Sequence, residues 1–325
     1  MSNLKLNFPL IYGKKALEVY DKINTSNNWD LSNIEIPHEF ISTIELIGKK
    51  GLEENKIENF KIPNSYINLQ KIPFYKNKKV CLAFSGGLDS VYQSLYLRKK
   101  GYEVCLLHIS NLNAYTNGQE LKIAREFSEK FNFYLEEIEF HKSGKKIWQE
   151  NPFKDFLIYS ICIDWCIKNK CNNISSGDDL RLSLKDAVFE TNVSDSKELT
   201  FSFFKKFPFI NFISVISSVT KDKRLKYLDQ FNARDYYNSC VGPGRLTQYL
   251  HNLNEKKYNV SLDKWNCASC RKCCSHIWYD YIFNNKNYPN NFLERCWNKM
   301  SIGADASFFK GKKSLEERKQ ALLSY

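Results

Sequence analysis

The sequence predicts an α/β protein with a doubly wound parallel sheet, an N-terminal extension and a helical C-terminal region. Between residues 77 and 195, short apolar runs typical of buried strands alternate with segments of helical length and spacing. Residues before 77 lack this alternation, and residues after 195 are rich in aromatic side chains and carry closely spaced cysteines. We therefore expect three parts, at 1–76, 77–195 and 196–325.

Composition narrows the class of protein. Hydrophobic residues make up 43% of the 325 residues, which is enough to bury a core and excludes a disordered chain. The net charge of +12 favours acidic partners such as nucleotides or RNA, although a basic surface without a specific partner is the alternative. We find neither an apolar run of about 18 residues nor a signal peptide. We therefore expect a cytoplasmic protein that binds no membrane and whose cysteines form no disulfides.

The elements of the α/β part follow from hydrophobic spacing. We predict strands at 79–84, 103–109, 133–140 and 173–176, and helices at 90–100, 118–131 and 152–170. Gly101 is expected to end the first of these helices. Elsewhere we predict helices at 38–48, 220–228 and 315–323, the last opened by a capping box of Ser314 and Glu317. Strands that alternate with helices favour parallel pairing.

A glycine-containing motif, Ser85-Gly86-Gly87-Leu88-Asp89-Ser90, lies between the first of these strands and its helix. The glycines allow a tight turn close to a ligand, and the free N–H groups at a helix start favour an anion. The hydroxyls of Ser85 and Ser90 add donors, and Asp89 suits magnesium binding or helix capping. The alternative is a plain turn, which a preceding buried strand and a following amphipathic helix make less favourable. The motif predicts a polyphosphate site.

The pattern SGGxDS is the signature of the PP-loop ATP pyrophosphatases, and the chain resembles this family. The resemblance implies their HUP-like fold and a reaction in which ATP adenylates a carbonyl or carboxylate oxygen. Pyrophosphate leaves, and a nitrogen or sulfur nucleophile then displaces AMP. It also implies that the six residues of the motif hold ATP and Mg²⁺: Ser85, Gly86, Gly87, Leu88, Asp89 and Ser90.

Cysteines cluster in the C-terminal part. Cys267, Cys270 and Cys273 have the spacing C-x2-C-x2-C, and Cys240 lies 27 positions before Cys267. Four thiolates that converge on one ion form a tetrahedral zinc site, which is mostly structural. Cys274 is an alternative ligand to Cys273, and an iron–sulfur cluster is an alternative to zinc. The spacing makes a group of unrelated thiols the less favoured interpretation.

Together the two motifs resemble 7-cyano-7-deazaguanine synthase, the QueC-type enzyme, which makes a nitrile from 7-carboxy-7-deazaguanine with ATP and ammonia. Five further pieces follow the family's order: Gly118-Gln119-Glu120 with Ala124, Pro152-Phe153-Lys154-Asp155, Ser176-Gly177-Asp178-Asp179, Thr220-Lys221, and Ser239-Cys240 before the cysteine trio. The resemblance implies Zn²⁺ on the four cysteines. Residues 1–76 depart from the family, as do Lys154 and Asp155, which replace arginine and asparagine.

The resemblance implies roles for further residues. His108 is expected near the adenine, and Gly177 and Asp178 beside the ribose. Lys154 and Lys221 are candidate catalytic cations for the leaving pyrophosphate or the substrate carboxylate, together with Asp89. For each of these, an ordinary structural role is the alternative: a hydrogen-bonded strand-end histidine, a turn, or a solvated lysine.

The resemblance leaves the nucleophile open. Divergent QueC-like proteins occur in antiphage gene clusters, namely type IV CBASS and Qat systems, which implies conjugation of a deazaguanine carboxylate to the amine of a partner protein. The alternative is a PP-loop tRNA-modifying enzyme, either a thiolase or a lysidine-type ligase, whose RNA binding would depend strongly on salt. A third hypothesis is a non-catalytic nucleotide-binding protein. We expect a homodimer, and we hypothesise that residues 1–76 bind a partner.

Overall fold

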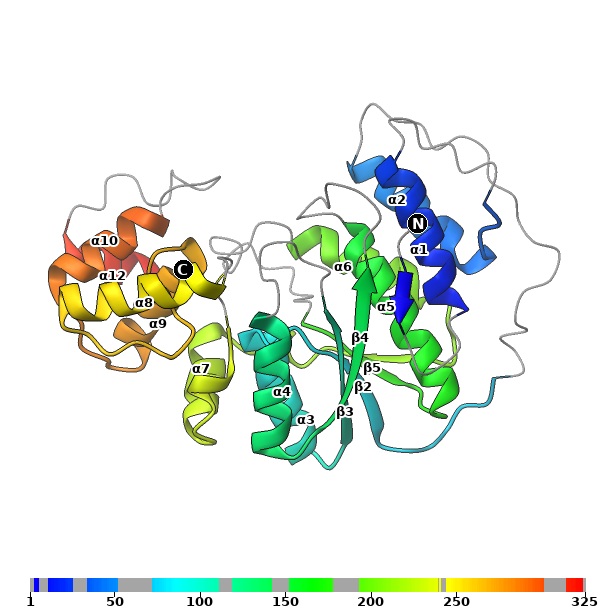
Figure 1. Cartoon of the computed structure of the whole chain (residues 1–325), viewed down its shortest axis with the longest axis horizontal. Helices are drawn as coiled ribbons and strands as arrows, with labels where there is room; N and C mark the ends of the chain where they lie inside the picture. Colours follow the sequence, from blue (N-terminus) through cyan, green and yellow to red (C-terminus); the bar gives the residue numbers. More distant parts are fainter. Residues whose placement is uncertain are drawn as a thin grey trace.

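The computed structural model describes the main chain of residues 3–5, 11–25, 34–51, 72–110, 119–141, 152–177, 193–238, 240, 244–300 and 314–323. Its centre is a six-stranded sheet in the order β1-β4-β3-β2-β5-β6 (Figure 1). The strands are β1 Asn3–Lys5, β2 Lys79–Ala83, β3 Glu103–Ser110, β4 Tyr134–His141, β5 Asn173–Ser175 and β6 Asn211–Ile213. Strands β2 to β6 pair in parallel, and β1 adds an antiparallel edge beside β4.

Helices cover both faces of this sheet (Figure 1). The helices of the described residues are α1 Tyr12–Thr25, α2 His38–Gly51, α3 Leu88–Lys99, α4 Gln119–Phe131, α5 Pro152–Lys168, α6 Val193–Phe204, α7 Lys221–Asp229, α8 Gly244–Tyr258, α9 Arg271–Phe283, α10 Asn290–Met300 and α12 Leu315–Leu323, with short 3-10 turns η3 Ile216–Ser218 and η4 Arg234–Tyr236. Of these, α8, α9, α10 and α12 lie to one side of the sheet (Figure 1). The α/β fold predicted from the sequence is confirmed.

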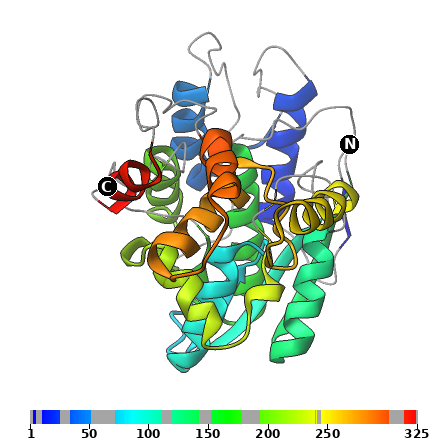
Figure 2. The same ribbon diagram turned by 90° about the vertical axis from the view of Figure 1, so that its left-hand side faces the viewer.

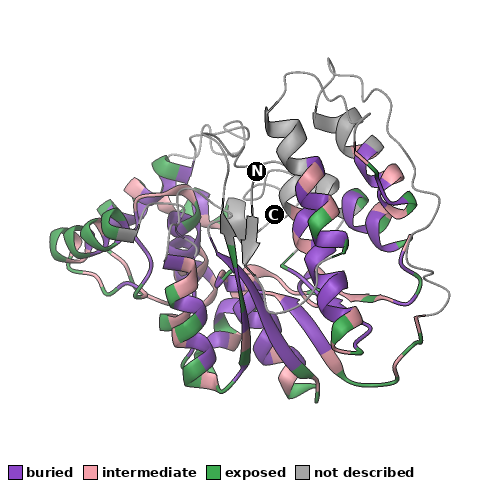
Figure 3. Cartoon of the chain, turned by 45° about the vertical axis from the view of Figure 1, so that its right-hand side comes forward, coloured by how far each residue is buried: buried purple, intermediate pink, exposed green. Residues whose placement is uncertain are grey.

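Strand β2 shows how the sequence builds two cores. Because side chains alternate along a strand, Val80 and Leu82 pack against α3, α4 and α7, whereas Cys81 packs with α1, α2, α5 and α6 on the opposite face. Figure 3 shows the strands largely buried between the helices. A continuous apolar run with both faces covered is typical of a central parallel strand.

The connections place a topological switch point at the centre of the sheet. Strand β2 pairs on one side with β3, the next strand in sequence, and on the other side with β5, which comes three strands after β2. The chain leaves β2 at the point where the strand order reverses. Ligands of doubly wound proteins bind outside the carboxyl ends of strands at such a point.

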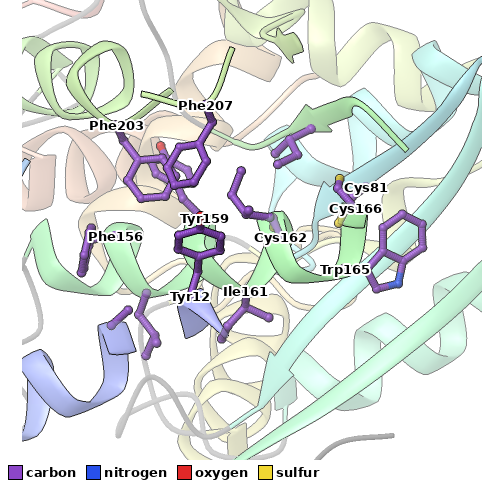
Figure 4. Packing of buried hydrophobic residues seen from close by; sticks show 14 of the residues in the cluster. Tyr12, Cys81, Phe156, Tyr159, Ile161, Cys162, Trp165, Cys166, Phe203 and Phe207 are labelled. Carbon is purple, nitrogen blue, oxygen red and sulfur yellow. The ribbon is translucent and has the colours of Figure 1, made fainter. Parts of the chain in front are cut away.

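Two helices from the first 76 residues pack against the α/β part. Tyr12 of α1 lies 5.1 Å from the ring of Phe207, and Phe40 of α2 lies 4.5 Å from the ring of Phe156. Figure 4 shows the aromatic side chains of this cluster packed around α5. The carboxylate of Asp164 on α5 accepts N–H bonds from residues 11 to 13, at 2.8 to 3.0 Å, and so caps the start of α1.

The C-terminal helices, which lie toward the viewer in Figure 2, form a smaller core of their own. Trp278 of α9 and Trp297 of α10 pack edge to face, with ring centroids 5.1 Å apart. Arg234 joins this unit to the α/β part, because it donates to Asp229 at the end of α7 and to Asp280 on α9.

The predicted elements occur within a few residues of their expected bounds, and two strands were not predicted. Strand β6 lies beyond residue 195, in the part expected to be helical, so the parallel sheet has five strands where four were predicted. Strands β1 and β6 have three residues each and are too short to give a hydrophobic pattern. Within the described residues, no helix combines the length and the apolar character that a bilayer crossing requires.

Candidate functional site

The phosphate loop, residues 85–90, joins β2 to α3 at the switch point. Gly86 has φ +72°, a conformation that a side chain disfavours, and a Cβ there would lie 3.1 Å from Cγ2 of Ile123. The first hydrogen bond of α3 runs from Val91 N–H to the Gly87 carbonyl. The N–H groups of residues 88–90 precede this first helical bond and are therefore available to an anion, as the sequence predicts.

Some side chains of this loop are exposed at the predicted ATP site, and others are buried and support the turn. Ser85 is exposed, and its Oγ accepts a 3.3 Å bond from Gly87 N–H. Ser90 is buried and donates from Oγ to the Gly87 carbonyl at 3.1 Å, so its hydroxyl supports the turn. Leu88 packs in the core, and only its main chain faces the predicted ATP site.

Asp89 forms an ion pair with Arg224. The guanidinium Nη1 donates to Asp89 Oδ1, and the Arg224 side chain has no exposed surface whereas that of Asp89 is 29% exposed. Arg224 Nε also donates to the Val219 carbonyl at 3.0 Å. The carboxylate of Asp89 is thus oriented by a buried cation on α7 and keeps one side open to a ligand.

Gly177, predicted to line the nucleotide site, does lie beside the phosphate loop. A Cβ on Gly177 would be 3.6 Å from Cβ of Asp89. The amide of Gln93 holds this end of β5, since Nε2 donates to the Ser176 carbonyl at 2.6 Å and Oε1 accepts from Ser175 Oγ at 2.8 Å. Asp178 lies outside the described residues.

Two buried polar side chains lie next to the loop without a full set of partners. His108, 1% exposed, contacts the Phe84 carbonyl through Nδ1 at 2.8 Å, whereas Nε2 has no partner. Burial lowers the pKa of His108, so the ring is neutral, with Nδ1–H donating and Nε2 accepting. Gln119 is 5% exposed, and neither of its amide atoms has a partner among the residues that the structure describes. Such groups are rare in a protein interior unless an ordered water or a ligand completes them.

The first turn of α7 approaches the same site. Thr220 is the N-cap of α7 and Lys221 its first residue, one helical turn before Arg224. The charge of Lys221 is close enough to His276 to contribute to the lowered pKa of that histidine, after burial. Lys154 lies in the first turn of α5, and its side chain is outside the described part of the chain.

The four predicted metal ligands come together. The Sγ atoms of Cys240, Cys267, Cys270 and Cys273 all lie within 4.8 Å of one another. Zn–S bonds of about 2.3 Å place tetrahedral thiolates about 3.8 Å apart, so one ion fits with little movement. A four-iron cluster holds its thiolates farther apart because each binds a different iron. Hydrogen bonds from the thiols of Cys240, Cys267 and Cys273 lower the pKa of Cys270, which favours thiolate at this site.

The other cysteines are separate from this group. Cys274 is fully buried among α9 and α10, and its Sγ donates to the Ala268 carbonyl at 3.5 Å. Cys273, not Cys274, therefore completes the set. All eleven cysteines are described, and each of the seven outside the set is buried.

The sequence of the chain is similar to those of two tRNA-specific 2-thiouridylases. No family model matches the chain. It is 22% identical over 195 residues to the tRNA-specific 2-thiouridylase MnmA of Ruthia magnifica subsp. Calyptogena magnifica, covering 53% of this chain and 51% of that protein. It is 35% identical over 88 residues to MnmA of Buchnera aphidicola subsp. Schizaphis graminum, covering 25% and 23%. The chain thus matches at most about half the length of these curated relatives. The similarity is to the PP-loop ATP pyrophosphatase superfamily.

Two solved structures of this superfamily also align with the chain. The U34-tRNA thiolase NcsA from Methanococcus maripaludis, with its [4Fe-4S] cluster, gives a TM-score of 0.40 at 16% identity and covers 77% of this chain and 81% of that one. The NH3-dependent NAD synthetase from Campylobacter jejuni, in complex with a nitrate ion, gives 0.35 at 12% identity and covers 85% and 98%. Scores this low support no statement about activity.

The structure brings three residues to the PP-loop motif for which the sequence predicts no role: Arg224, Asn238 and Gln119. Arg224 lies three positions after Lys221, a spacing that places both on one face of a helix and could have drawn attention to it. Asn238 binds the loop through its main chain, which no sequence pattern indicates. Gln119 belongs to a motif that resembles the QueC-type family. That its amide atoms have no hydrogen-bond partner among the described residues is visible only in the folded chain.

Proposed function

We propose that this protein is an ATP-dependent enzyme that adenylates an oxygen atom of its substrate and releases pyrophosphate. The observation that carries the proposal is the phosphate loop itself, which opens α3 at the carboxyl end of the central strand with Gly86 in a left-handed conformation. That arrangement suits a polyphosphate. In this proposal Asp89 carries Mg²⁺, and Lys221 stabilises the leaving pyrophosphate.

A purine-like base fits the unpartnered groups beside the loop. The Nε2 atom of His108 needs a donor, and the Gln119 amide can both donate and accept, as in bidentate recognition of adenine. His108 lies in β3 and Gln119 begins the helix that follows it, and the family resemblance implies an adenine near His108. A purine or deazapurine edge supplies the matching donors and acceptors.

The favoured substrate is the carboxylate of 7-carboxy-7-deazaguanine. A carboxylate oxygen attacks the α-phosphorus of ATP, the bond to the bridging oxygen breaks, and pyrophosphate leaves with that electron pair. A nitrogen nucleophile then attacks the acyl adenylate, loses a proton and displaces AMP to give an amide. A nitrile would require a second activation, of the amide oxygen. The convergence of Cys240 with the cysteine trio, as the QueC-type resemblance implies, supports this choice.

We assign Zn²⁺ to the four cysteines as a structural ion. Four buried or half-buried thiols within 4.8 Å, with all four places taken by protein, leave no open position for catalysis. Metal binding would hold Cys240 against the C-terminal helices and release thiol protons.

The second candidate is a tRNA-modifying enzyme. The sequence similarity to two tRNA-specific 2-thiouridylases and the net charge of +12 support it. A thiolase needs an accessible reactive cysteine or an iron–sulfur cluster, and the seven cysteines outside the metal group are buried. The identity of the metal therefore discriminates: zinc favours the deazaguanine substrate, and iron favours tRNA thiolation.

The nucleophile and the assembly belong to the same proposal. Ammonia would give a biosynthetic product, and the amine of a partner protein would give a conjugate of the kind expected in antiphage defence. We retain a cytoplasmic homodimer and a partner-binding role for residues 1–76 as predictions.

The test measures pyrophosphate release and product mass. Purified protein is incubated with ATP, Mg²⁺ and 7-carboxy-7-deazaguanine, with and without ammonia or candidate partner proteins, and in parallel with tRNA. Asp89→Asn is the control, because it keeps an acceptor for Arg224. Release that depends on the deazaguanine supports the first candidate, and release that depends on tRNA and falls steeply with salt supports the second. Release with neither substrate, in protein that holds its metal, contradicts both.

A further inference from the structure

One short segment joins the cysteine group to the phosphate loop. The main-chain N–H of Asn238 donates to the Gly86 carbonyl at 2.7 Å. Two residues later, Cys240 is one of the four candidate metal ligands. Ser85 and Cys240 are 155 positions apart in the sequence. In the fold, the residue that bonds to the phosphate loop is only two residues from a candidate metal ligand.

The bond to Gly86 controls the direction of a peptide plane. A trans peptide is planar, so its carbonyl and its N–H point in opposite directions. Holding the Gly86 carbonyl toward Asn238 turns the N–H of Gly87 away from that segment. Ile123 of α4 also lies against the loop, because a Cβ on Gly86 would be 3.1 Å from its Cγ2. The Asn238 carbonyl lies 3.6 Å from the position of a Cβ on Gly87, so both segments limit the movement of the loop.

The side chain of Asn238 fixes the other end of the connection. Its Oδ1 accepts a 2.7 Å bond from Cys240 N–H, and its Nδ2 donates to the Cys240 carbonyl at 3.3 Å. Asn238 is only 7% exposed. The position of Cys240 is in turn set by the other three thiols and by Thr247, whose Oγ1 lies 3.2 Å from Cys240 Sγ. A displacement of Cys240 therefore moves Asn238 with it.

We propose that the four-cysteine site acts as a clasp on the phosphate loop, and that Asn238 is the positioning residue through which metal binding orders the loop for a polyphosphate. The ligand class rests on the proposed function, whereas the mechanical connection does not. The metal then has a role in nucleotide affinity in addition to its role in folding. Because coupling between two binding sites is reciprocal, a bound polyphosphate must also retain the metal more tightly.

The first experiment measures both directions of this coupling. The affinity for inorganic pyrophosphate and for Mg²⁺–ATP is measured by calorimetry on cobalt-loaded protein and after removal of the metal by a chelator. We expect metal removal to weaken binding about tenfold, within the usual range for coupled sites. In the other direction, saturating pyrophosphate should raise the affinity of the protein for cobalt by the same factor. Competition with the chelator measures this affinity, and the thiolate-to-cobalt absorption band reports how much cobalt stays on the protein. Equal affinities with and without metal, in protein that stays folded, would overturn the proposal.

Asn238→Ala tests the connection without metal removal, and Asn266→Ala is its matched control. Asn266 is also 7% exposed, and its Oδ1 also accepts the N–H two residues on, that of Ala268, at 2.8 Å; it lies beside Cys267 and has no bond to the loop. Both variants should keep the four-thiolate cobalt spectrum. Only Asn238→Ala should lose about tenfold in pyrophosphate affinity, and metal removal should cause no further loss in that variant. Equal effects of the two substitutions would contradict the inference.

Hydrogen exchange separates this inference from the proposed function. Without any nucleotide, removing the metal should abolish protection of the Asn238 amide, which donates to Gly86, and should raise exchange in peptides that cover residues 84–90. If holoprotein binds neither ATP nor pyrophosphate but shows this change, the proposed function fails and the clasp stands. If it binds them and the exchange is independent of metal, the clasp fails and the function stands.

Discussion

The fully buried guanidinium of Arg224 pairs with the carboxylate of Asp89, the acidic residue of the phosphate loop. The two residues are 135 positions apart in sequence and lie on α7 and α3. Asp89 therefore balances a buried cation, and in the proposed function it also carries Mg²⁺. A substitution at Asp89 affects folding and catalysis together, and the design of variants must separate these effects.

Asp89→Ala should destabilise the protein more than removal of both partners. It removes the Asp89 carboxylate from the buried Arg224 guanidinium, and breaking a buried ion pair from one side typically costs about 3 kcal/mol of unfolding free energy. In the double variant Asp89→Ala with Arg224→Met the buried charge is gone, so we expect part of that loss to be recovered. Urea unfolding of the wild type, both single variants and the double variant measures the coupling. Strict additivity would show that the ion pair carries no net coupling.

Gly86→Ala should strongly weaken polyphosphate binding. The substitution places a Cβ at positive φ and 3.1 Å from Ile123, so the loop must change shape. We expect more than tenfold weaker pyrophosphate binding and a loss of about 1–2 kcal/mol in stability. Gly101→Ala is the control, since Gly101 also has positive φ, at the opposite end of α3 with only the Lys78 ammonium nearby. The Gly101→Ala variant should lose stability and keep its affinity for pyrophosphate. If both variants lost the same affinity, backbone strain alone would explain the effect of Gly86→Ala.

Gln119→Leu should make the free protein more stable and its ligand binding weaker. Both amide atoms of Gln119 are buried without partners, and removing such atoms should raise the unfolding free energy by about 1 kcal/mol. If a base completes these bonds, the KM for the base-bearing substrate should rise at least tenfold. Thermal unfolding and steady-state kinetics measure the two effects. A loss of stability without a change in KM would assign Gln119 a purely structural role.

Cys273→Ser should lose the metal, whereas Cys274→Ala should retain it. Cys273 belongs to the group of four, and Cys274 lies in the separate core of α9 and α10. We expect one equivalent of metal in the Cys274 variant, at a cost in stability of about 1 kcal/mol for the lost packing. Metal analysis of both purified variants is the measurement. Retention of metal by the Cys273 variant would mean that another residue completes the site.

His276 should make the protein less stable at mildly acidic pH. Burial lowers its pKa to about 3 from an ordinary value of 6.5, with the Lys221 charge contributing next. Below pH 6.5 the unfolded chain binds a proton that the folded chain does not, so stability falls as the pH is lowered. Between pH 7.5 and 5.5 this amounts to about 1.4 kcal/mol. His276→Gln should remove this contribution, so the change in unfolding free energy between the two pH values should differ from that of the wild type by this amount, as measured by urea unfolding. An identical change in the two proteins would exclude a contribution from His276.

Local features of this protein were determined by the sequence alone. The loop at 85–90 lies between a strand and a helix because glycine conformation and hydrophobic spacing act over a few residues. The capping box is present as predicted, with Ser314 N–H donating to Glu317 Oε2 at 2.9 Å and Glu317 N–H to Ser314 Oγ at 3.1 Å. The cysteine trio likewise required only its spacing, because neighbouring turns bring such ligands together.

Long-range relationships were decided only by the tertiary structure. Strand β5 pairs with β2 instead of β4, β6 extends the sheet, Arg224 reaches Asp89, and the Asn238 amide holds Gly86. Each joins segments that are far apart in the chain, and no local periodicity records which distant partner a main-chain amide or a buried charge will find. The sequence determines which groups have chemistry to perform, and the packing of the sheet and its helices determines which of them meet, because contacts between distant segments form only when the whole core is assembled.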